Sequence, residues 1–406
     1  MQAIKKQSTT WQEGHAKNIT FIVTKDCQLA CKYCYLVGKN SKERMTWDVA
    51  KSSIDYILNH ENDADFAYKS VIWDFIGGEP FLEIDLIDRI CDYIKIEMYR
   101  RNHHWFYSYR FNFATNGINY DSPKVQKFIA KNSDHLSIGI TIDGTERKHD
   151  LNRVYKQSGR GSYNDVVRNI PLWQKQFPNE GTKVTISSED IPYICESVLH
   201  LYKLNIKNVF INCVYESVWK KGDDILFEQQ LIALADAIIE GEYYKNYYCS
   251  LFGENIGRYM DKQLMNQNWC GAGKMLAIDA AGNFYPCTRF AQYSLRDKEA
   301  WVIGNIHDGI DKNKLRPFLT LDRCTQSTPE CVNCEVAEGC AWCQGENFDA
   351  AKTHTVFERA TAICKMHKAR VRANNYYWNK LYRKLELEGK REEFEANKKT
   401  INPEIC

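Results

Sequence analysis

The sequence predicts an α/β fold, in which a partial (β/α)6 TIM-like barrel is followed by a cysteine-rich domain and a helical C-terminal tail. Strand-like and helix-like stretches alternate through the first 240 residues, which predicts parallel strands because parallel neighbours need crossover connections. Six such units make three quarters of an eightfold barrel. Beyond the barrel, cysteines concentrate in residues 270–364, and residues 365–406 are highly charged with helical character.

Six strand-length stretches are expected to form the sheet: Ile19–Thr24, Val71–Ile76, Arg110–Thr115, Leu136–Ile142, Lys183–Ser187 and Asn208–Asn212. The amphipathic stretches that follow them are Trp47–Leu58, Leu86–Met98, Pro123–Ala130, Tyr163–Trp173, Ile191–Leu204 and Leu226–Glu240. We therefore expect a barrel over 1–240, a bridging region over 241–269, a cysteine-rich domain over 270–364 and a helical extension over 365–406. Because residues 270–364 contain few long apolar runs, we expect them to have little core of their own and to be held together by metal ligation.

The composition is that of an ordinary globular protein, since 44% of the 406 residues are hydrophobic, 26% are charged and the net charge is +2. This balance favours neither nucleic acid nor an anionic membrane as a partner. The apolar runs are too short to span a membrane, and the N-terminus lacks the apolar stretch of a secretory signal, so we expect a cytoplasmic protein. Sixteen cysteines in such a chain indicate metal or redox centres rather than a disulfide framework.

The first cysteine motif follows the first expected strand, where Cys27, Cys31 and Cys34 are spaced C-x3-C-x2-C. Three thiolates on one tight loop can bind three irons of a [4Fe–4S] cluster and leave the fourth iron without a protein ligand. The loop lies at the C-terminal end of a parallel strand, where α/β barrels build their active sites. Zinc is disfavoured because it prefers four ligands in paired motifs, and no further Cys or His follows closely.

This loop resembles the signature of the radical SAM superfamily, with Tyr33 in the aromatic position. At the end of the second strand, Gly77, Gly78, Glu79 and Pro80 match the GGEP motif of that family. The resemblance implies that S-adenosylmethionine binds at the open iron and that this motif holds its methionine amino group. Glycines let the backbone approach a ligand closely, and Glu79 can accept hydrogen bonds from an ammonium.

Polar residues follow three further strands and one loop. Thr115 and Asn116 end the third strand, and Asp143 ends the fourth. By the resemblance they lie near the methionine and ribose of the cofactor, although plain β-to-α turns rich in Asn, Asp and Gly explain them too. Ser187 ends the fifth strand and is a further expected ribose contact. Arg153 pairs either with the cofactor carboxylate or with a carboxylate in a surface salt bridge, and the sequence leaves both open.

The second group of cysteines resembles the SPASM domain of radical SAM peptide maturases, with one interval of two residues, before Cys343, where the family has three. The resemblance implies two auxiliary [4Fe–4S] clusters. One is held by Cys331, Cys334, Cys340 and Cys364. The other is held by Cys270, Cys287 and Cys343, and its fourth ligand is either Cys324 or a thiolate of the substrate. A zinc site built from the same cysteines is the alternative.

These resemblances, which cover about residues 18–365, imply three [4Fe–4S] clusters and cleavage of S-adenosylmethionine to a 5′-deoxyadenosyl radical. They also imply a Cys-rich precursor peptide with a leader as substrate and a flavodoxin- or ferredoxin-type electron donor. The group of maturases most similar to this chain forms thioether crosslinks (ranthipeptides with CXXX repeats), here from Cys sulfur to the β-carbon of Asp. Only 26 residues precede Cys27, too few for a leader-recognition domain, so we expect the leader to bind the barrel, the SPASM surface or a separate protein.

Three other functions stay open. A sulfatase-maturing enzyme forms formylglycine, but its family carries an Asp directly after the position of Cys287, where this chain has Thr288, and an extra cysteine that residues 271–277 lack. A second alternative is a maturase that forms carbon–carbon crosslinks. The third is a zinc-stabilised binding module without catalysis.

Overall fold

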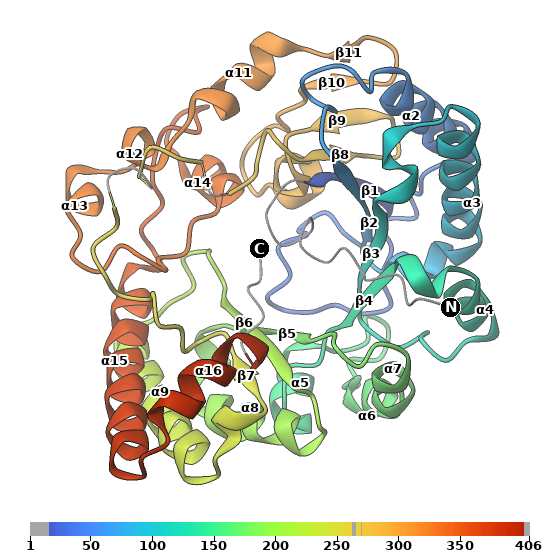
Figure 1. Ribbon diagram of the computed structural model, residues 1–406. Coiled ribbons are helices and arrows are strands. Elements are labelled where there is room, and N and C mark those ends of the chain that lie inside the picture. The colour runs from blue at the N-terminus through green and yellow to red at the C-terminus, as the bar shows by residue number, and fades with distance from the viewer. Residues whose placement is uncertain (1–15, 262–264, 269, 402–406) are drawn as a thin grey trace.

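The structure, a computed structural model, describes residues 16–261, 265–268 and 270–401. The six expected parallel strands are β1 (Ala16–Thr24), β2 (Ser70–Gly77), β3 (Tyr109–Thr115), β4 (Leu136–Ile140), β5 (Thr182–Ile186) and β6 (Asn208–Cys213). β1 to β4 pair in chain order, whereas β5 and β6 belong to a second sheet with the short strand β7 (Tyr248–Cys249) (Figure 1). Between β4 and β5 the segments pair at an isolated parallel bridge of Thr141 with Lys183. Beside it, the Thr182 hydroxyl donates to the Ile140 carbonyl at 2.7 Å and accepts from the Ile142 N–H at 3.0 Å.

The strands alternate between an apolar outer face and a polar inner face, as expected from the period of two in a strand. On the outer face, the ring of Phe21 stacks on those of Trp73 and Phe75 at centroid distances of 6.1 and 5.7 Å. On the inner face, Asp74 accepts hydrogen bonds from the Thr20 hydroxyl at 3.2 Å and the Asn112 amide at 2.6 Å. The hydrophobic core therefore lies between the sheet and its helices.

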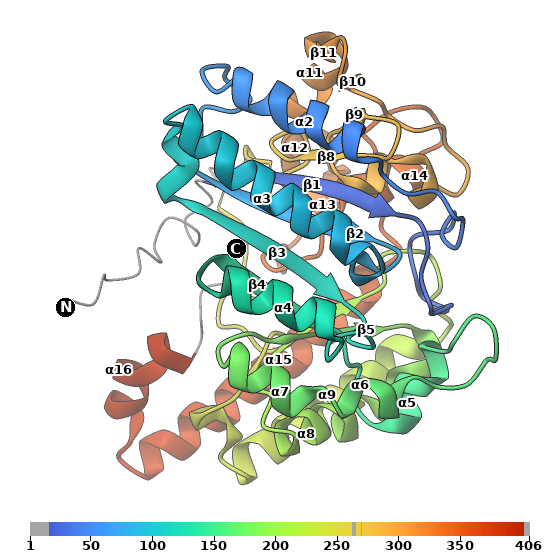
Figure 2. The ribbon, with the colours of Figure 1, turned by 90° about the vertical axis from the view of Figure 1, so that its right-hand side faces the viewer.

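Helices cover the outer face of the barrel (Figure 2). They are α2 (Trp47–Asn59), α3 (Ile84–Arg100), α4 (Pro123–Asn132), α5 (Glu146–Asn152), α6 (Tyr163–Val167), α7 (Ile170–Gln176), α8 (Ile194–Lys203) and α9 (Asp223–Glu240). The stretch Tyr163–Trp173, which we expected to be one helix, forms two. The break arises because Pro171 has no N–H to donate to the preceding turn. In addition, the Asn169 side chain at the break donates to the Gly117 carbonyl at 2.8 Å.

The cysteine-rich segment continues the barrel's own sheet. Its first strand, β8 (Leu276–Ile278), pairs in parallel with β1, and β9 (Asn283–Tyr285), β10 (Gly304–Asn305) and β11 (Gly309–Ile310) follow antiparallel. The expectation that this segment has little core of its own is wrong. Phe290, Phe318 and Phe348 are at most 1% exposed, and their rings form a continuous packed group with Trp301. Long apolar runs in the sequence do not indicate this core, because turns separate its aromatic residues.

The remaining elements of this segment are the short helices α11 (Lys312–Thr320), α12 (Arg323–Gln326), α13 (Pro329–Val332) and α14 (Gln344–Ala350). The chain ends with α15 (Cys364–Leu387), which packs along α9, and α16 (Arg391–Ile401) (Figure 1). Ion pairs fix α15 to α9, such as Arg372 with Glu228 at 2.6 Å and Lys380 with Asp236 at 2.6 Å. Among the described residues, no helix is long and apolar enough to cross a membrane.

Candidate active site and cysteine clusters

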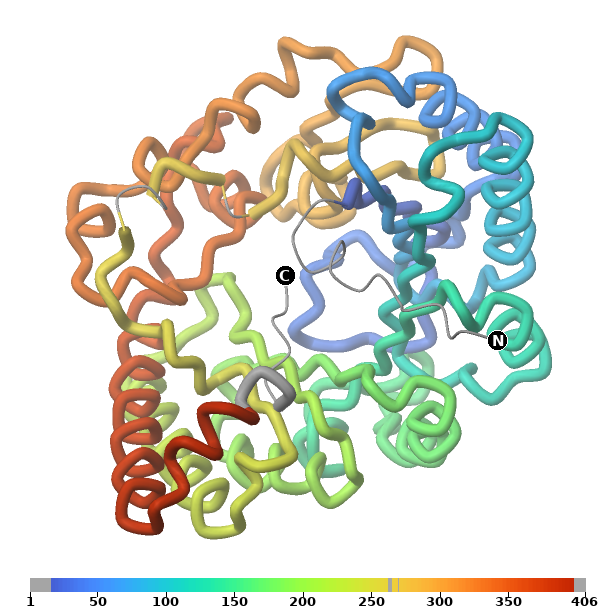
Figure 3. Tube along the Cα trace, in the orientation of Figure 1, coloured from blue at the N-terminus to red at the C-terminus, as the bar shows by residue number. Residues whose placement is uncertain are grey.

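Cys27, Cys31 and Cys34 lie on the loop that leaves β1, which runs through the middle of Figure 3. The segment after α5 holds this loop in place. The Ala30 N–H donates to the Val154 carbonyl at 2.8 Å, and the Lys32 N–H donates to the Asn152 carbonyl at 3.1 Å. Burial raises the pKa of Cys27 to about 12, so this thiol stays protonated until a metal replaces its proton. We refer to residues 27–37 as the cluster loop.

Gly77 and Gly78 let the cluster loop lie directly on the end of β2. A Cβ at Gly77 would stand 2.3 Å from the Thr24 carbonyl oxygen, and one at Gly78 would stand 2.1 Å from that of Asp26. The Gly78 N–H donates to the Thr24 carbonyl at 3.0 Å, and the Glu79 N–H donates to the Asp26 carbonyl at 2.8 Å. We expected these glycines to admit a ligand. In the structure they admit the backbone that leads into Cys27, and Pro80 then starts a 3-10 helix.

Glu79 is 1% exposed and connects three of the expected cofactor contacts. Its Oε1 accepts hydrogen bonds from the Thr115 hydroxyl at 2.6 Å and the Phe81 N–H at 3.1 Å, and its Oε2 accepts from the Asn116 N–H at 2.8 Å. Burial raises the pKa of Glu79, and these hydrogen bonds oppose the rise. The Asn116 amide nitrogen lies 3.9 Å from Cys27 Sγ. Glu79 keeps free lone pairs, so this arrangement suits an ammonium ligand beside the cluster loop.

Tyr33, Asp143 and Arg153 form a second buried group next to the first. The Tyr33 hydroxyl donates to Asp143 Oδ2 and accepts from Arg153 Nη1 at 3.0 Å. Burial alone would raise the pKa of Asp143, but the charges of Lys148 and Arg153 outweigh it, so this pKa is lowered.

Arg153 itself is 7% exposed, which contradicts a surface salt bridge. Its Nε is buried and has no hydrogen-bond partner among the described residues. A buried guanidinium with an unused N–H suits a planar anionic ligand such as a carboxylate.

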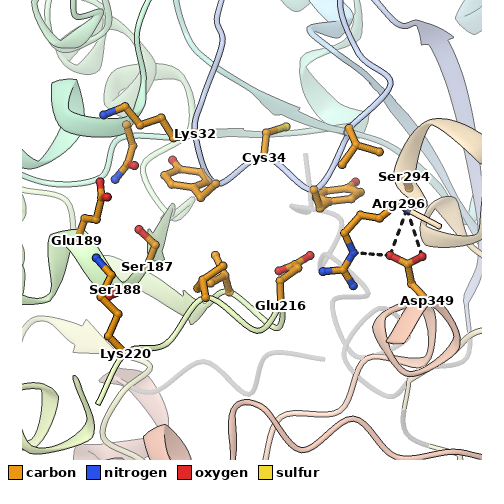
Figure 4. Close-up of a pocket in the computed structure, with 16 residues that line it drawn as sticks. Lys32, Cys34, Ser187, Ser188, Glu189, Glu216, Lys220, Ser294, Arg296 and Asp349 are labelled. Carbon is orange, nitrogen blue, oxygen red and sulfur yellow. Dashed lines mark hydrogen bonds and ion pairs between the residues drawn. The ribbon is translucent and has the colours of Figure 1, made fainter. Parts of the chain in front are cut away.

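A cavity of about 380 Å³ opens beside these groups (Figure 4). Cys34 lines one wall, and Ser187, at the end of β5, lines the opposite wall with Glu216, after β6. Tyr33 also lines the cavity. The third wall comes from the cysteine-rich segment, where Arg296 forms an ion pair with Asp349 at 2.7 Å.

Sequence reasoning identified Ser187 but missed the other lining residues from distant segments, among them Glu216, Ser294, Arg296 and Asp349. No motif contains them. Their proximity results from how the cysteine-rich segment packs against the barrel, which no local spacing encodes.

The structure gathers seven of the eight cysteines of the second group into two sets. Cys331, Cys334, Cys340 and Cys364 line one cavity of about 350 Å³. The other set is Cys270, Cys287 and Cys343. Burial raises the pKa of Cys270 to about 11, and the neighbouring Cys343 raises it further. Burial also raises the pKa of Cys287, as do Cys270 and Cys343. Cys324 joins neither set, because it lies exposed on α12 and lines neither cavity.

Within the described ranges, one group of metal-ligand side chains has its ligand atoms all within 4.8 Å of one another, and it is Glu61, His103 and His104.

The radical SAM superfamily profile matches residues 21–187, the stretch that carries the cluster loop and the ends of β2 to β5. Over these residues the barrel is similar to the radical SAM superfamily.

The whole chain also resembles solved structures. It is 18% identical to anSMEcpe with bound AdoMet and Kp18Cys peptide (TM-score 0.63; 90% of this chain and 99% of that chain covered). It is 16% identical to Streptococcus suis SuiB bound to precursor peptide SuiA (TM-score 0.56; 86% and 76% covered). At these identities the likeness shows the fold, and it confirms the predicted radical SAM barrel with a cysteine-rich domain and a helical tail.

Two curated relatives share sequence with the radical SAM domain and beyond. An uncharacterized protein of Methanocaldococcus jannaschii is 26% identical over 300 residues, which cover 74% of this chain and 91% of that protein. A serine-type anaerobic sulfatase-maturating enzyme of Bacteroides thetaiotaomicron is 22% identical over 293 residues, which cover 65% and 67%.

Proposed function

We propose that this protein is a cytoplasmic radical S-adenosylmethionine maturase that forms Cys thioether crosslinks in a ribosomally made precursor peptide. The observation that carries the proposal is the cavity of about 380 Å³, in which the cluster loop, the ends of β5 and β6 and the cysteine-rich segment meet. One cavity thus adjoins the proposed radical source and the domain that holds the proposed auxiliary sites. The chain resembles the thioether-forming ranthipeptide maturases, of which the freyrasin maturase PapB is an example.

Three [4Fe–4S] clusters fit the three cysteine sets, with Cys27, Cys31 and Cys34 holding the cluster next to the cavity. When bound, this cluster and S-adenosylmethionine supply an electron and a 5′-deoxyadenosyl radical. The electron comes from a flavodoxin- or ferredoxin-type protein.

The chain's own residues bind and orient the cofactor. Glu79 accepts the methionine ammonium, and Arg153 holds its carboxylate through the unused Nε. Thr115 and Asn116 fix Glu79, and Asp143 fixes the Tyr33 ring of the cluster loop. Ser187 faces the cavity from the opposite wall and contacts the ribose. Because these polar groups are held by the fold, they need little reorganisation when the cofactor binds.

A peptide substrate is supported by the relatives of this fold, because the anSMEcpe structure holds a Kp18Cys peptide and the SuiB structure holds the precursor SuiA. The crosslink removes two hydrogens from the peptide. A hydrogen atom leaves the β-carbon of Asp for the deoxyadenosyl radical, a proton leaves the Cys thiol, and one electron leaves as the carbon–sulfur bond forms. Cys270, Cys287 and Cys343 would hold three irons of a cluster there, which would leave one position for the substrate thiolate.

Formylglycine formation is the second candidate, and the similarity to a sulfatase-maturating enzyme favours it. The sequence weighs against it, because Thr288 stands where that family has its Asp. A maturase that forms carbon–carbon crosslinks is the third candidate.

Co-expression with a Cys-rich precursor, followed by mass spectrometry, separates these reactions. A thioether is expected to remove two hydrogens per crosslink and to leave that cysteine unreactive toward an alkylating reagent. A carbon–carbon crosslink gives the same mass change with alkylatable cysteines. Formylglycine gives an aldehyde that a hydrazide captures. Either of the last two results contradicts the proposal, and so does an unchanged peptide.

A further inference from the structure

The cavity lined by Cys331, Cys334, Cys340 and Cys364 contains two arginines as well as thiols. Arg323 and Arg359 stand beside the Trp342 ring, with their Cζ atoms 5.7 and 5.6 Å from its centroid. Among the residues that the structure describes, the hydrogen bonds of both guanidinium groups go to backbone carbonyls and to a thiol rather than to carboxylates. Glu330 and Glu335 line the same cavity, so acidic as well as basic side chains border it.

Backbone contacts fix both arginines around Cys340. Arg323 Nη2 donates to the Ala337 carbonyl at 2.8 Å, and Arg359 Nη2 donates to the Ala341 carbonyl at 2.7 Å. The same Arg359 nitrogen lies 3.6 Å from Cys340 Sγ. Trp342, between the two cations, donates its indole N–H to Gln326. The guanidinium of Arg359 is thus held against a sulfur that we assign as a cluster ligand.

The second terminal nitrogen of Arg359, Nη1, is buried and has no hydrogen-bond partner among the described residues. A buried guanidinium N–H without an acceptor is costly, so its place beside four thiols indicates an anionic acceptor in the cavity. A [4Fe–4S] cluster with four thiolates is such a group, because it carries net negative charge and its sulfurs accept hydrogen bonds. Hydrogen bonds to sulfur and nearby charge are among the factors that set the reduction potential of a cluster.

We infer that Arg359 is a redox-tuning residue, which donates hydrogen bonds to the sulfurs of the cluster held by Cys331, Cys334, Cys340 and Cys364 and raises its reduction potential. Arg323 adds a second positive charge on the same side. This inference rests on the proposed function, in which carbon–sulfur bond formation releases one electron. A cluster held by these four cysteines would take up that electron without a proton and would return it to the flavodoxin- or ferredoxin-type partner.

The test is a redox titration followed by electron paramagnetic resonance, on reconstituted protein that lacks Cys27, Cys31 and Cys34, so that only the auxiliary clusters give signals. Arg359→Met is expected to shift the midpoint potential of one cluster to a more negative value and to leave the other unchanged. Arg359→Gln keeps an amide N–H for the Ala341 carbonyl while removing the charge, and it is expected to give the same shift if the Met variant folds poorly. Arg316→Met, an exposed arginine on α11, is the control and is expected to leave both potentials unchanged.

A second readout is thermal unfolding before and after iron loading. Without iron, the Arg359 variants are expected to melt at a higher temperature than the Arg316 control, because they lack a charge that has no ion-pair partner among the described residues. After iron loading, they are expected to melt at a lower temperature than that control. The inference would be overturned if both Arg359 variants carry their full iron content and the midpoint potentials of their clusters are unchanged. If the unaltered protein binds only one cubane, both the assignment of the auxiliary clusters and this role of Arg359 are overturned. A chain that shows the shift but forms no thioether would overturn the crosslink and leave this role of Arg359 intact.

Discussion

The Tyr33 hydroxyl accepts a hydrogen bond from Arg153 Nη1 at 3.0 Å, which ties the cluster loop to a buried cation of the proposed cofactor site. Through the same hydroxyl, Tyr33 donates to Asp143 at the end of β4. One phenol thus fixes the loop, the cation and the strand end to one another.

Tyr33→Phe removes these two hydrogen bonds and keeps the ring. Leaving Asp143 and Arg153 without this partner is expected to cost about 1–3 kcal/mol, and so to weaken S-adenosylmethionine binding roughly tenfold. Equilibrium dialysis on the reconstituted protein measures this affinity. Tyr107→Phe is the control, because Tyr107 is 83% exposed. Equal affinities in the two variants would contradict the role of the hydroxyl.

Gly78→Ala tests how the cluster loop is seated. The new Cβ would stand 2.1 Å from the Asp26 carbonyl oxygen, so the loop has to shift, at a cost of about 1–3 kcal/mol typical of overpacking. We expect the protein to fold and to lose about a third of its iron, the share of one cubane in three. Gly139→Ala is the matched control, because its Cβ meets no atom nearer than 3.6 Å. Full iron content in Gly78→Ala is the contrary result.

The cysteine sets are expected to separate two activities. Alanine at Cys27, Cys31 and Cys34 removes the proposed radical source and should abolish 5′-deoxyadenosine. Alanine at Cys331 and Cys334 should spare part of that cleavage and impair the peptide product, because this set lies in another domain. Chromatography of the nucleoside and mass spectrometry of the peptide measure both. Deoxyadenosine from the triple variant would refute the assignment of the radical cluster.

His149 makes stability depend on pH. Burial lowers the pKa of His149 to about 3 from its usual value of 6.5, and the neutral ring accepts from the Asp143 N–H through Nδ1 at 3.2 Å. The unfolded chain therefore binds a proton that the folded chain does not, and this stability is lost as pH falls from about 6.5 toward 3. At pH 5.5 the loss is about 1.4 kcal/mol.

Thermal unfolding at pH 7.5 and 5.5 measures this dependence. The melting temperature of His149→Gln is expected to fall less between pH 7.5 and pH 5.5 than that of the unaltered protein. His307→Gln, at an exposed position, should behave as the unaltered protein does. The same pH sensitivity in all three proteins would show that His149 contributes nothing to it.

The sequence predicts the barrel well because its strands and helices are periodic and its motifs fall at strand ends. The cluster loop and Glu79 with Thr115 and Asn116 come together as expected, since the carboxyl ends of parallel strands share one edge. That the Gly78 position accommodates the Asp26 backbone was not predictable without the distance between the two segments.

Features that depend on packing between distant segments could not be predicted from the sequence. β8 was not expected to join β1, because a strand of three residues is too short to show an alternating pattern. Arg296 and Asp349 approach the cavity only after the cysteine-rich segment has packed on the barrel. The Cys324 alternative arose from counting cysteines, and its exposed position on α12 places it apart from Cys270, Cys287 and Cys343.

The most direct test is electron paramagnetic resonance of the reduced, iron-loaded protein before and after S-adenosylmethionine is added. Binding of the cofactor at the free iron of the Cys27, Cys31 and Cys34 cluster is expected to change the signal of that cluster, and the variant that lacks these cysteines is expected to show no change. A spectrum of the unaltered protein that stays the same when the cofactor is added would contradict the proposed site.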